Sequence, residues 1–122
     1  MIYTSYFAKP KYGRGIEISI ANSQPRSIQL DKYQKLIPPW NIVSAWKNKQ
    51  ITWDEFTKQY TERVLDKLNP SEIAAELDGC ILCCWEKDFR VCHRTIVRKW
   101  LKKHGFPCEE LDFRTNEKYW FK

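Results

Sequence analysis

Two short motifs hold the residues of this chain that are best suited to chemistry. Cys84-Trp85-Glu86-Lys87 is followed shortly by Cys92-His93-Arg94. Together they supply two thiols, a carboxylate, an imidazole and two cationic side chains, which can attack, exchange protons or bind an anion. The first N–H groups of a helix lack intrahelical partners, and the helix dipole adds partial positive charge there. If the second motif begins a helix, we therefore expect the junction to bind an anion.

Cys92 is the strongest candidate for a reactive group. A thiol at a helix N-terminus, next to His93 and near Arg94, has the positive surroundings that stabilise a thiolate. Such a thiolate would suit nucleophilic catalysis or reversible oxidation. The alternative is a half-buried small residue that helps the loop to pack. We predict that Cys92 is the most reactive of the five thiols.

The charged neighbours of Cys92 extend this prediction. An arginine in the first turn of a helix opposes the helix dipole, and residues that break a local rule are often functional. We therefore expect Arg94, with Lys87 nearby, to bind an anion. Glu86 could receive a ribose hydroxyl, act as a base or nucleophile, or form a structural pair with Arg94. His93 could shuttle protons or bond a loop carbonyl, so any catalysis is assigned to Cys92, Glu86 and His93.

The elements that would position these motifs are a strand and a helix. Residues 79–85 are apolar throughout, which is typical of a central strand covered on both faces. Residues 92–104 carry one apolar stripe and end at a glycine, which predicts an amphipathic helix. Residues 107–111 can form a last strand. Strand, helix and strand then make a right-handed parallel unit, so we predict a single α/β domain with a small, mainly parallel sheet flanked by helices.

Residues 2–77 are predicted to form two strands and three helices. Residues 2–7 and 16–20 are β-rich, and the basic loop between them is too short for a helical crossover. These strands are therefore either antiparallel neighbours or separated by other strands. A short helix near residues 42–47 precedes a capping box of Thr52 and Glu55, which starts a helix to about residue 68. Asn69-Pro70 caps another helix to about residue 77.

Parallel strands bring their carboxyl ends to one edge of a sheet, where ligands of open α/β sheets bind. We expect a polar cleft there, at residues 84–87 and 92–94. The side chains predicted to bind the ligand are Arg94, Lys87, Cys84, Tyr6, Lys9, Asn22 and Ser23.

The other cysteines have a structural interpretation. Cys80 and Cys83 would point to opposite faces of one strand, so they cannot share a metal ion, and we expect both in the core. No metal site and no cofactor are predicted. Cys84 could lie near Cys92, and a reversible disulfide is possible, although a cytoplasmic setting favours free thiols.

The bulk properties are those of an ordinary globular protein. The chain has 122 residues, 43% hydrophobic and 30% charged, with a net charge of +6. No apolar stretch is long enough to span a membrane, and the N-terminus lacks a signal-peptide pattern, so we expect a cytoplasmic protein without a membrane partner.

The quoted motifs, together with the start at residues 2–9 and the strand at residues 18–20, resemble domain-of-unknown-function family 488, a group of uncharacterised bacterial and phage proteins. The resemblance covers residues 1–111. It implies a compact α/β domain whose characteristic residues are Cys84, Glu86, Lys87, Cys92, His93 and Arg94, and it implies no reaction. Residues 112–122 are predicted to be a basic, aromatic tail added to that domain.

The sequence predicts binding of a phosphate-bearing small molecule such as a nucleotide, with thiol- or carboxylate-dependent chemistry. Two alternatives stay open. The basic loop and the aromatic tail could form a nucleic-acid-binding module. A phage-type protein that inhibits a host protein would need no chemistry.

Overall fold

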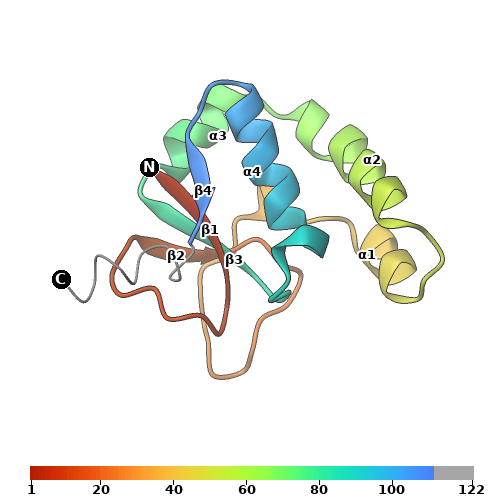
Figure 1. Cartoon of the computed structure of the whole chain (residues 1–122), viewed down its shortest axis with the longest axis horizontal. Helices are drawn as coiled ribbons and strands as arrows, with labels where there is room; N and C mark the ends of the chain where they lie inside the picture. Colours follow the sequence, from red (N-terminus) through yellow and green to blue (C-terminus); the bar gives the residue numbers. More distant parts are fainter. Residues whose placement is uncertain (112–122) are drawn as a thin grey trace.

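Four parallel strands form the centre of the computed structural model, which describes residues 1–111 (Figure 1). Their order in the sheet is β2-β3-β1-β4. The strands are β1 (Ile2–Tyr6), β2 (Ile16–Ser19), β3 (Cys80–Cys84) and β4 (Cys108–Glu110). The predicted α/β class with a mainly parallel sheet is confirmed, since every pairing among these strands is parallel. The predicted tail, residues 112–122, lies outside the described residues.

Strand β3 is the apolar centre of the sheet. All five of its residues are buried, and it pairs with β1 on one side and β2 on the other. An apolar run of this kind fits a strand that is covered on both faces. Cys80 and Cys83 are buried as predicted, and burial raises the pKa of the Cys83 thiol to about 12.

The first two strands are parallel and are separated by β3, which settles the question that their short connection left open. Residues 7–15 make this crossing without a helix. Lys11 is buried inside the crossing and donates to the carbonyls of Tyr6 (2.7 Å) and Phe7 (2.8 Å). These bonds satisfy main-chain acceptors at the start of the crossing.

Strand β2 forms one edge of the sheet and does not follow a simple in–out alternation. Ile16 is 67% exposed, whereas Ser19 is fully buried. The chain returns along this edge, because the Ser19 N–H donates to Asp31 and the Ser19 carbonyl accepts from Tyr33. The returning segment covers the end of β2 that the polar serine occupies.

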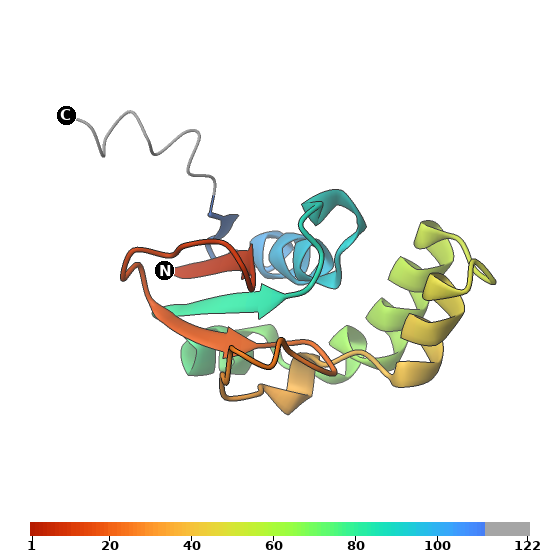
Figure 2. The same cartoon turned by 90° about the horizontal axis from the view of Figure 1, so that it is seen from below.

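Four α-helices accompany the sheet, and α4 packs against β1, β3 and β4 (Figure 2). They are α1 (Trp40–Lys47), α2 (Trp53–Arg63), α3 (Pro70–Leu77) and α4 (His93–Lys103); short 3-10 helices span Gln34–Leu36, Leu65–Lys67 and Phe89–Val91. No helix of residues 1–111 has the length and apolar character to cross a membrane.

The predicted start of α2 agrees with the structure, whereas its predicted end does not. Thr52 and Glu55 form the expected capping box, and Asn69 caps α3. Helix α2 ends at Arg63 rather than near residue 68. The backbone leaves the helical conformation at Val64, and the following 3-10 turn places Leu65 in the core, where it is 1% exposed.

Helices α1 and α2 form a hairpin (residues 40–63) that lies to one side of the sheet in both views (Figure 1, Figure 2). Tyr60 anchors it, since the buried Tyr60 hydroxyl donates to the Leu36 carbonyl at 2.6 Å. The Tyr60 ring also contacts the His93 ring edge-on, with 5.7 Å between centroids. This contact joins the hairpin to the first residue of α4.

Candidate functional site

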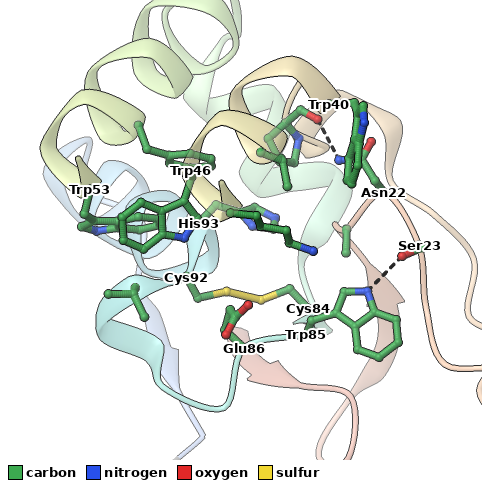
Figure 3. A pocket seen from close by; sticks show the side chains of 16 residues that line it. Asn22, Ser23, Trp40, Trp46, Trp53, Cys84, Trp85, Glu86, Cys92 and His93 are labelled. Atoms are coloured by element: carbon green, nitrogen blue, oxygen red, sulfur yellow. Dashed lines mark hydrogen bonds between the residues drawn. A yellow bond between two sulfur atoms is a disulfide. The ribbon is translucent and has the colours of Figure 1, made fainter. Parts of the chain in front are cut away.

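A pocket lies where the carboxyl ends of β2 and β3 face the α1–α2 hairpin (Figure 3). Its empty volume is about 530 Å³, part of which is open to solvent. Six residues predicted from the sequence line it: Asn22, Ser23, Cys84, Glu86, Cys92 and His93. The other lining residues are Ala21, Pro38, Trp40, Val43, Trp46, Lys47, Trp53, Phe56, Trp85 and Val91.

Cys84 and Cys92, which both line the pocket, are joined by a disulfide (Figure 3). Cys84 is the last residue of β3, and Cys92 is the N-cap residue of α4. The sequence favoured free thiols at both positions. The two residues come together because the chain between them folds back through the 3-10 turn Phe89–Val91. The predicted high reactivity of Cys92 stays a prediction and applies to the reduced pair.

His93 is the first residue of α4 and is 9% exposed. Its Nε2 lies 2.6 Å from the Ile20 carbonyl, so of the two roles considered from the sequence the structure shows the bond to a loop carbonyl. A carbonyl can only accept, so Nε2 carries the proton in this bond. Burial, together with the charge of Arg94, lowers the pKa of His93 to about 4 and outweighs the opposing effect of the bond to Ile20. The ring is therefore neutral near pH 7.

Arg94 is fully buried, and its contacts engage all five of its N–H donors. Nε and Nη2 form a bidentate pair with Glu110 at 2.9 and 3.1 Å. Nη1 donates to the Cys84 sulfur at 3.2 Å and to the Glu86 carbonyl, and Nη2 also donates to the Lys87 carbonyl at 3.3 Å. These bonds give Arg94 a positioning role for the β3–α4 loop. An anion could bind it only by displacing one of these partners.

Glu86 lines the pocket with an exposed side chain. The carboxylate that pairs with Arg94 belongs to Glu110 at the end of β4. Within residues 1–111, the Glu86 carboxylate has no hydrogen bond or ion pair, and only its main-chain carbonyl contacts Arg94. This leaves a carboxylate at the pocket that a ligand can use.

Besides Arg94, three further predicted binding residues lie outside the pocket lining. Lys9 donates to the Leu111 carbonyl, and its ammonium lies 5.8 Å from the centre of the Tyr6 ring. The same ring lies 5.9 Å from the guanidinium carbon of Arg94. Lys87 contributes its carbonyl to Arg94. Tyr6, Lys9 and Lys87 therefore surround the buried arginine, whereas the pocket opens on the other side of the disulfide.

Asn22 and Ser23 follow β2 and lie at the pocket as expected for a strand end. The Asn22 amide donates to the Pro38 carbonyl at 3.0 Å, and the Ser23 hydroxyl accepts from the Trp85 indole N–H at 3.1 Å. These bonds tie the end of β2 to the hairpin entrance and to the end of β3. The Ser23 hydroxyl keeps its own proton available for a ligand.

Sequence reasoning gave none of the four tryptophans of the pocket a binding role, although Trp85 lies within the predicted cleft. Trp40, Trp46 and Trp53 come from the α1–α2 hairpin, and Trp85 follows β3 (Figure 3). Trp40 and Trp85 are 58% and 46% exposed. The available signal was Trp85 within the first motif and Trp40 directly after two prolines. Trp46 and Trp53 gave no such signal, because indoles at helical spacing normally indicate core packing.

Three ligand atoms lie close enough together to hold a metal ion. The Cys84 and Cys92 sulfurs and a ring nitrogen of His93 are within 4.8 Å of one another. The sequence predicted no metal ligands, because it considered Cys80 and Cys83 and not this combination. The sequence signal for this group is the pair Cys92-His93, which follows the strand-end Cys84 by eight residues.

Fold and pocket together define a small α/β protein whose candidate site lies at the carboxyl ends of parallel strands. Residues 2–105 match the model of the family DUF488-N3a, described as the active DUF488-N3 subclade. The chain belongs to this family, which confirms the resemblance found in its motifs. No curated protein and no solved structure matches the chain.

Proposed function

We propose that the protein binds a phosphate-bearing small molecule with a planar ring, such as a nucleotide, in the pocket between β2, β3 and the α1–α2 hairpin. The observation that carries this proposal is the lining by four indoles, two of them widely exposed to solvent. Indole rings offer flat faces on which a base can stack, and each base–aromatic stack contributes about 1–3 kcal/mol.

Trp46, Trp53 and Phe56 support the stacking surface. Trp46 and Trp53 are 5.1 Å apart between ring centroids, and Trp53 stacks on the buried Phe56 at 4.7 Å with an interplanar angle of 8°. Rings that are held by other rings lose little conformational freedom when a ligand binds. Such a surface is therefore suited to a flat, rigid ligand.

The polar groups of the pocket suit the rest of a nucleotide. Lys47 lies with its ammonium 5.7 Å from the centre of the Trp40 ring, where it can meet a phosphate. The N-terminus of α4 adds partial positive charge on the same side through Cys92 and His93. The Glu86 carboxylate, which has no partner among residues 1–111, and the Ser23 hydroxyl can bond ribose hydroxyls.

Thiol- or carboxylate-dependent chemistry on the bound molecule is part of the proposal. The Cys84–Cys92 pair and Glu86 border the pocket, and the family model that the chain matches describes its subclade as active. We propose the cytoplasm as the location, because it supplies both nucleotides and the thiol reductants that would open the disulfide.

The test is calorimetric titration of the full chain with adenosine triphosphate, adenosine monophosphate and inorganic phosphate. We expect the two nucleotides to bind and Trp40→Ala and Trp85→Ala each to weaken binding by roughly 5- to 150-fold, which corresponds to about 1–3 kcal/mol. Phe89→Ala is the matched control, because Phe89 is an exposed aromatic residue (39%) outside the pocket lining. Unchanged affinity in both tryptophan variants would contradict the proposal.

The nucleic-acid alternative gains no support from the loop at residues 9–14. Lys11 is buried and bonds two main-chain carbonyls, and Lys9 bonds the Leu111 carbonyl. A phosphate backbone needs cations that face solvent. The inhibitor alternative likewise has no observation that favours it over the pocket.

A further inference from the structure

We propose that the reduced form of the protein binds a Zn²⁺-class cation through the thiolates of Cys84 and Cys92 and the imidazole of His93. The three ligands line the same pocket as the proposed stacking surface, but binding of the cation does not depend on nucleotide binding. Disulfide formation removes both sulfur ligands, so the two states of the cysteine pair are a metal-free form and a metal-binding form.

The positions of the three ligands carry this proposal. Their ligand atoms lie within 4.8 Å of one another, and all three residues are buried. A tetrahedral zinc site with Zn–S bonds of about 2.3 Å places its ligand atoms roughly 3.5–3.8 Å apart. Reduction frees the two sulfurs to separate toward that spacing. Two cysteines and one histidine are a ligand set that zinc takes in proteins.

Secondary structure fixes where each ligand comes from. Cys84 ends the central strand, Cys92 is the N-cap residue of α4, and His93 is the first residue of that helix. Two of the ligands are therefore adjacent in sequence, and the third is held by the pairing of β3 with both neighbouring strands. A site built on such elements needs little rearrangement to accept a cation.

Neighbouring groups orient the ligands in the manner of a metal site. His93 Nε2 donates its proton to the Ile20 carbonyl at 2.6 Å, which leaves Nδ1 as the nitrogen with a free lone pair. Metal-binding histidines commonly use their second nitrogen in this way. Arg94 Nη1 lies 3.2 Å from the Cys84 sulfur, where its charge favours the thiolate.

Three protein ligands leave a fourth coordination position. All three residues line the pocket, so water or a molecule bound in the cavity could supply the fourth ligand. Three protein ligands with an open position are the arrangement of reactive zinc sites, whereas structural zinc sites have four protein ligands. The structure thus points to a cation that a pocket ligand can reach.

The redox step balances with a thiol reductant. Two thiols of the reductant supply two electrons and two protons to the Cys84–Cys92 disulfide and become a disulfide themselves. Zn²⁺ then binds the two sulfurs and releases their two protons. A small-molecule disulfide reverses the step: it takes two electrons from the bound thiolates and two protons from solvent and becomes two thiols, which leaves the Cys84–Cys92 disulfide and free Zn²⁺.

The experiment uses the full chain, freed of metal with a chelator and prepared in oxidised and reduced form. Each form is titrated with Co²⁺, whose visible and near-ultraviolet absorption reports tetrahedral thiolate coordination. We expect one Co²⁺ per reduced chain, displaced by Zn²⁺, and no such spectrum from the oxidised protein. Cys92→Ser and His93→Gln should weaken Co²⁺ binding roughly tenfold or more.

Cys83→Ser is the matched control, because Cys83 is a buried cysteine directly before Cys84 and lies outside the ligand group. It should keep the Co²⁺ spectrum of the reduced wild type. Circular dichroism checks that each variant folds, and the comparison of oxidised with reduced wild type needs no variant. Equal spectra from both redox forms, or a wild-type spectrum from folded Cys92→Ser, would overturn the proposal. Nucleotide is absent throughout, so this result is independent of the proposed nucleotide binding.

Discussion

The two sides of the Cys84–Cys92 link differ in how completely their polar groups are satisfied. On the inner side, Arg94 is fully buried and every N–H donor of its guanidinium has a protein partner. On the pocket side, Trp40 and Trp85 expose about half of their surfaces, and Glu86 has a carboxylate without a partner among residues 1–111.

The residues of this short region therefore differ in whether their polar groups are used within the protein or are available to a ligand. Arg94 is a buried ion whose donors are all satisfied, and removing it would leave Glu110 without its counter-charge. Its bonds to the Glu86 and Lys87 carbonyls hold the β3–α4 loop in place. Exposed indoles and unpaired polar groups around a pocket contribute little to folding and are available to a ligand. His93 lines the pocket, whereas the adjacent Arg94 does not.

The largest expected effect is on the inner side. Arg94→Ala should lower the free energy of unfolding by about 3–5 kcal/mol, because it leaves the partly buried Glu110 and two loop carbonyls without their donor. Urea denaturation followed by circular dichroism measures it. Lys102→Ala is the control, since the exposed Lys102–Glu109 pair should contribute less than about 1 kcal/mol. Equal losses in the free energy of unfolding for the two variants would contradict the special role proposed for the buried Arg94.

The second prediction concerns thiol reactivity after mild reduction. Burial raises the pKa of both Cys83 and Cys108 to about 12, so few of these thiols are ionised at pH 7. Cys92 borders the pocket at the N-terminus of α4, and we expect brief iodoacetamide treatment to label it more than tenfold faster. Peptide mass spectrometry assigns the sites. Labelling of Cys92 only after unfolding would show that its sulfur is a packing atom.

A smaller effect is expected at the pocket rim. Lys47→Ala should weaken binding of adenosine triphosphate severalfold and reduce its salt dependence, because one exposed cation near the phosphate is lost. Its effect on the free energy of unfolding should stay within about 0.5 kcal/mol. Lys58→Ala, an exposed cation on α2 outside the lining, serves as the control. A severalfold loss in both variants would indicate a general charge effect.

The smallest effect tests whether the hairpin can be weakened without touching the pocket. Thr52→Ala removes the side-chain acceptor of the capping box and should cost about 1 kcal/mol of stability. Thr52 does not line the pocket, so nucleotide affinity should be unchanged at temperatures where the protein is folded. Thermal unfolding and calorimetry together measure both quantities. A large loss of affinity would show that the pocket depends on the start of α2.

The parts of the fold that the sequence predicted are those set by local signals. The apolar run of β3, the stripe and glycine stop of α4, and the capping box of Thr52 and Glu55 each occupy one contiguous stretch. The order of β1 and β2 could not be predicted, because it depends on β3, about sixty residues later.

In the candidate site too, the residues set by local sequence were predicted, and those that depend on distant parts of the chain were not. Cys84, Glu86, Cys92 and His93 were found because they share one strand–helix junction. The Arg94–Glu110 pair was missed because Glu110 lies on β4, and Glu86 was a closer candidate in sequence. The tryptophans of the hairpin were missed because only the packing of α1 and α2 decides which indoles face a cavity.

The position of the α1–α2 hairpin has a consequence for how this fold can diversify. The sulfur, imidazole and carboxylate groups of the pocket come from the sheet end and the start of α4, whereas three of its four indoles come from residues 40–63. The hairpin is a continuous insert beside the sheet (Figure 2). Under the proposed function, substitutions confined to the hairpin can change which ligand stacks in the pocket while the sulfur, imidazole and carboxylate groups keep their places, so the two sets of residues can vary separately along one chain.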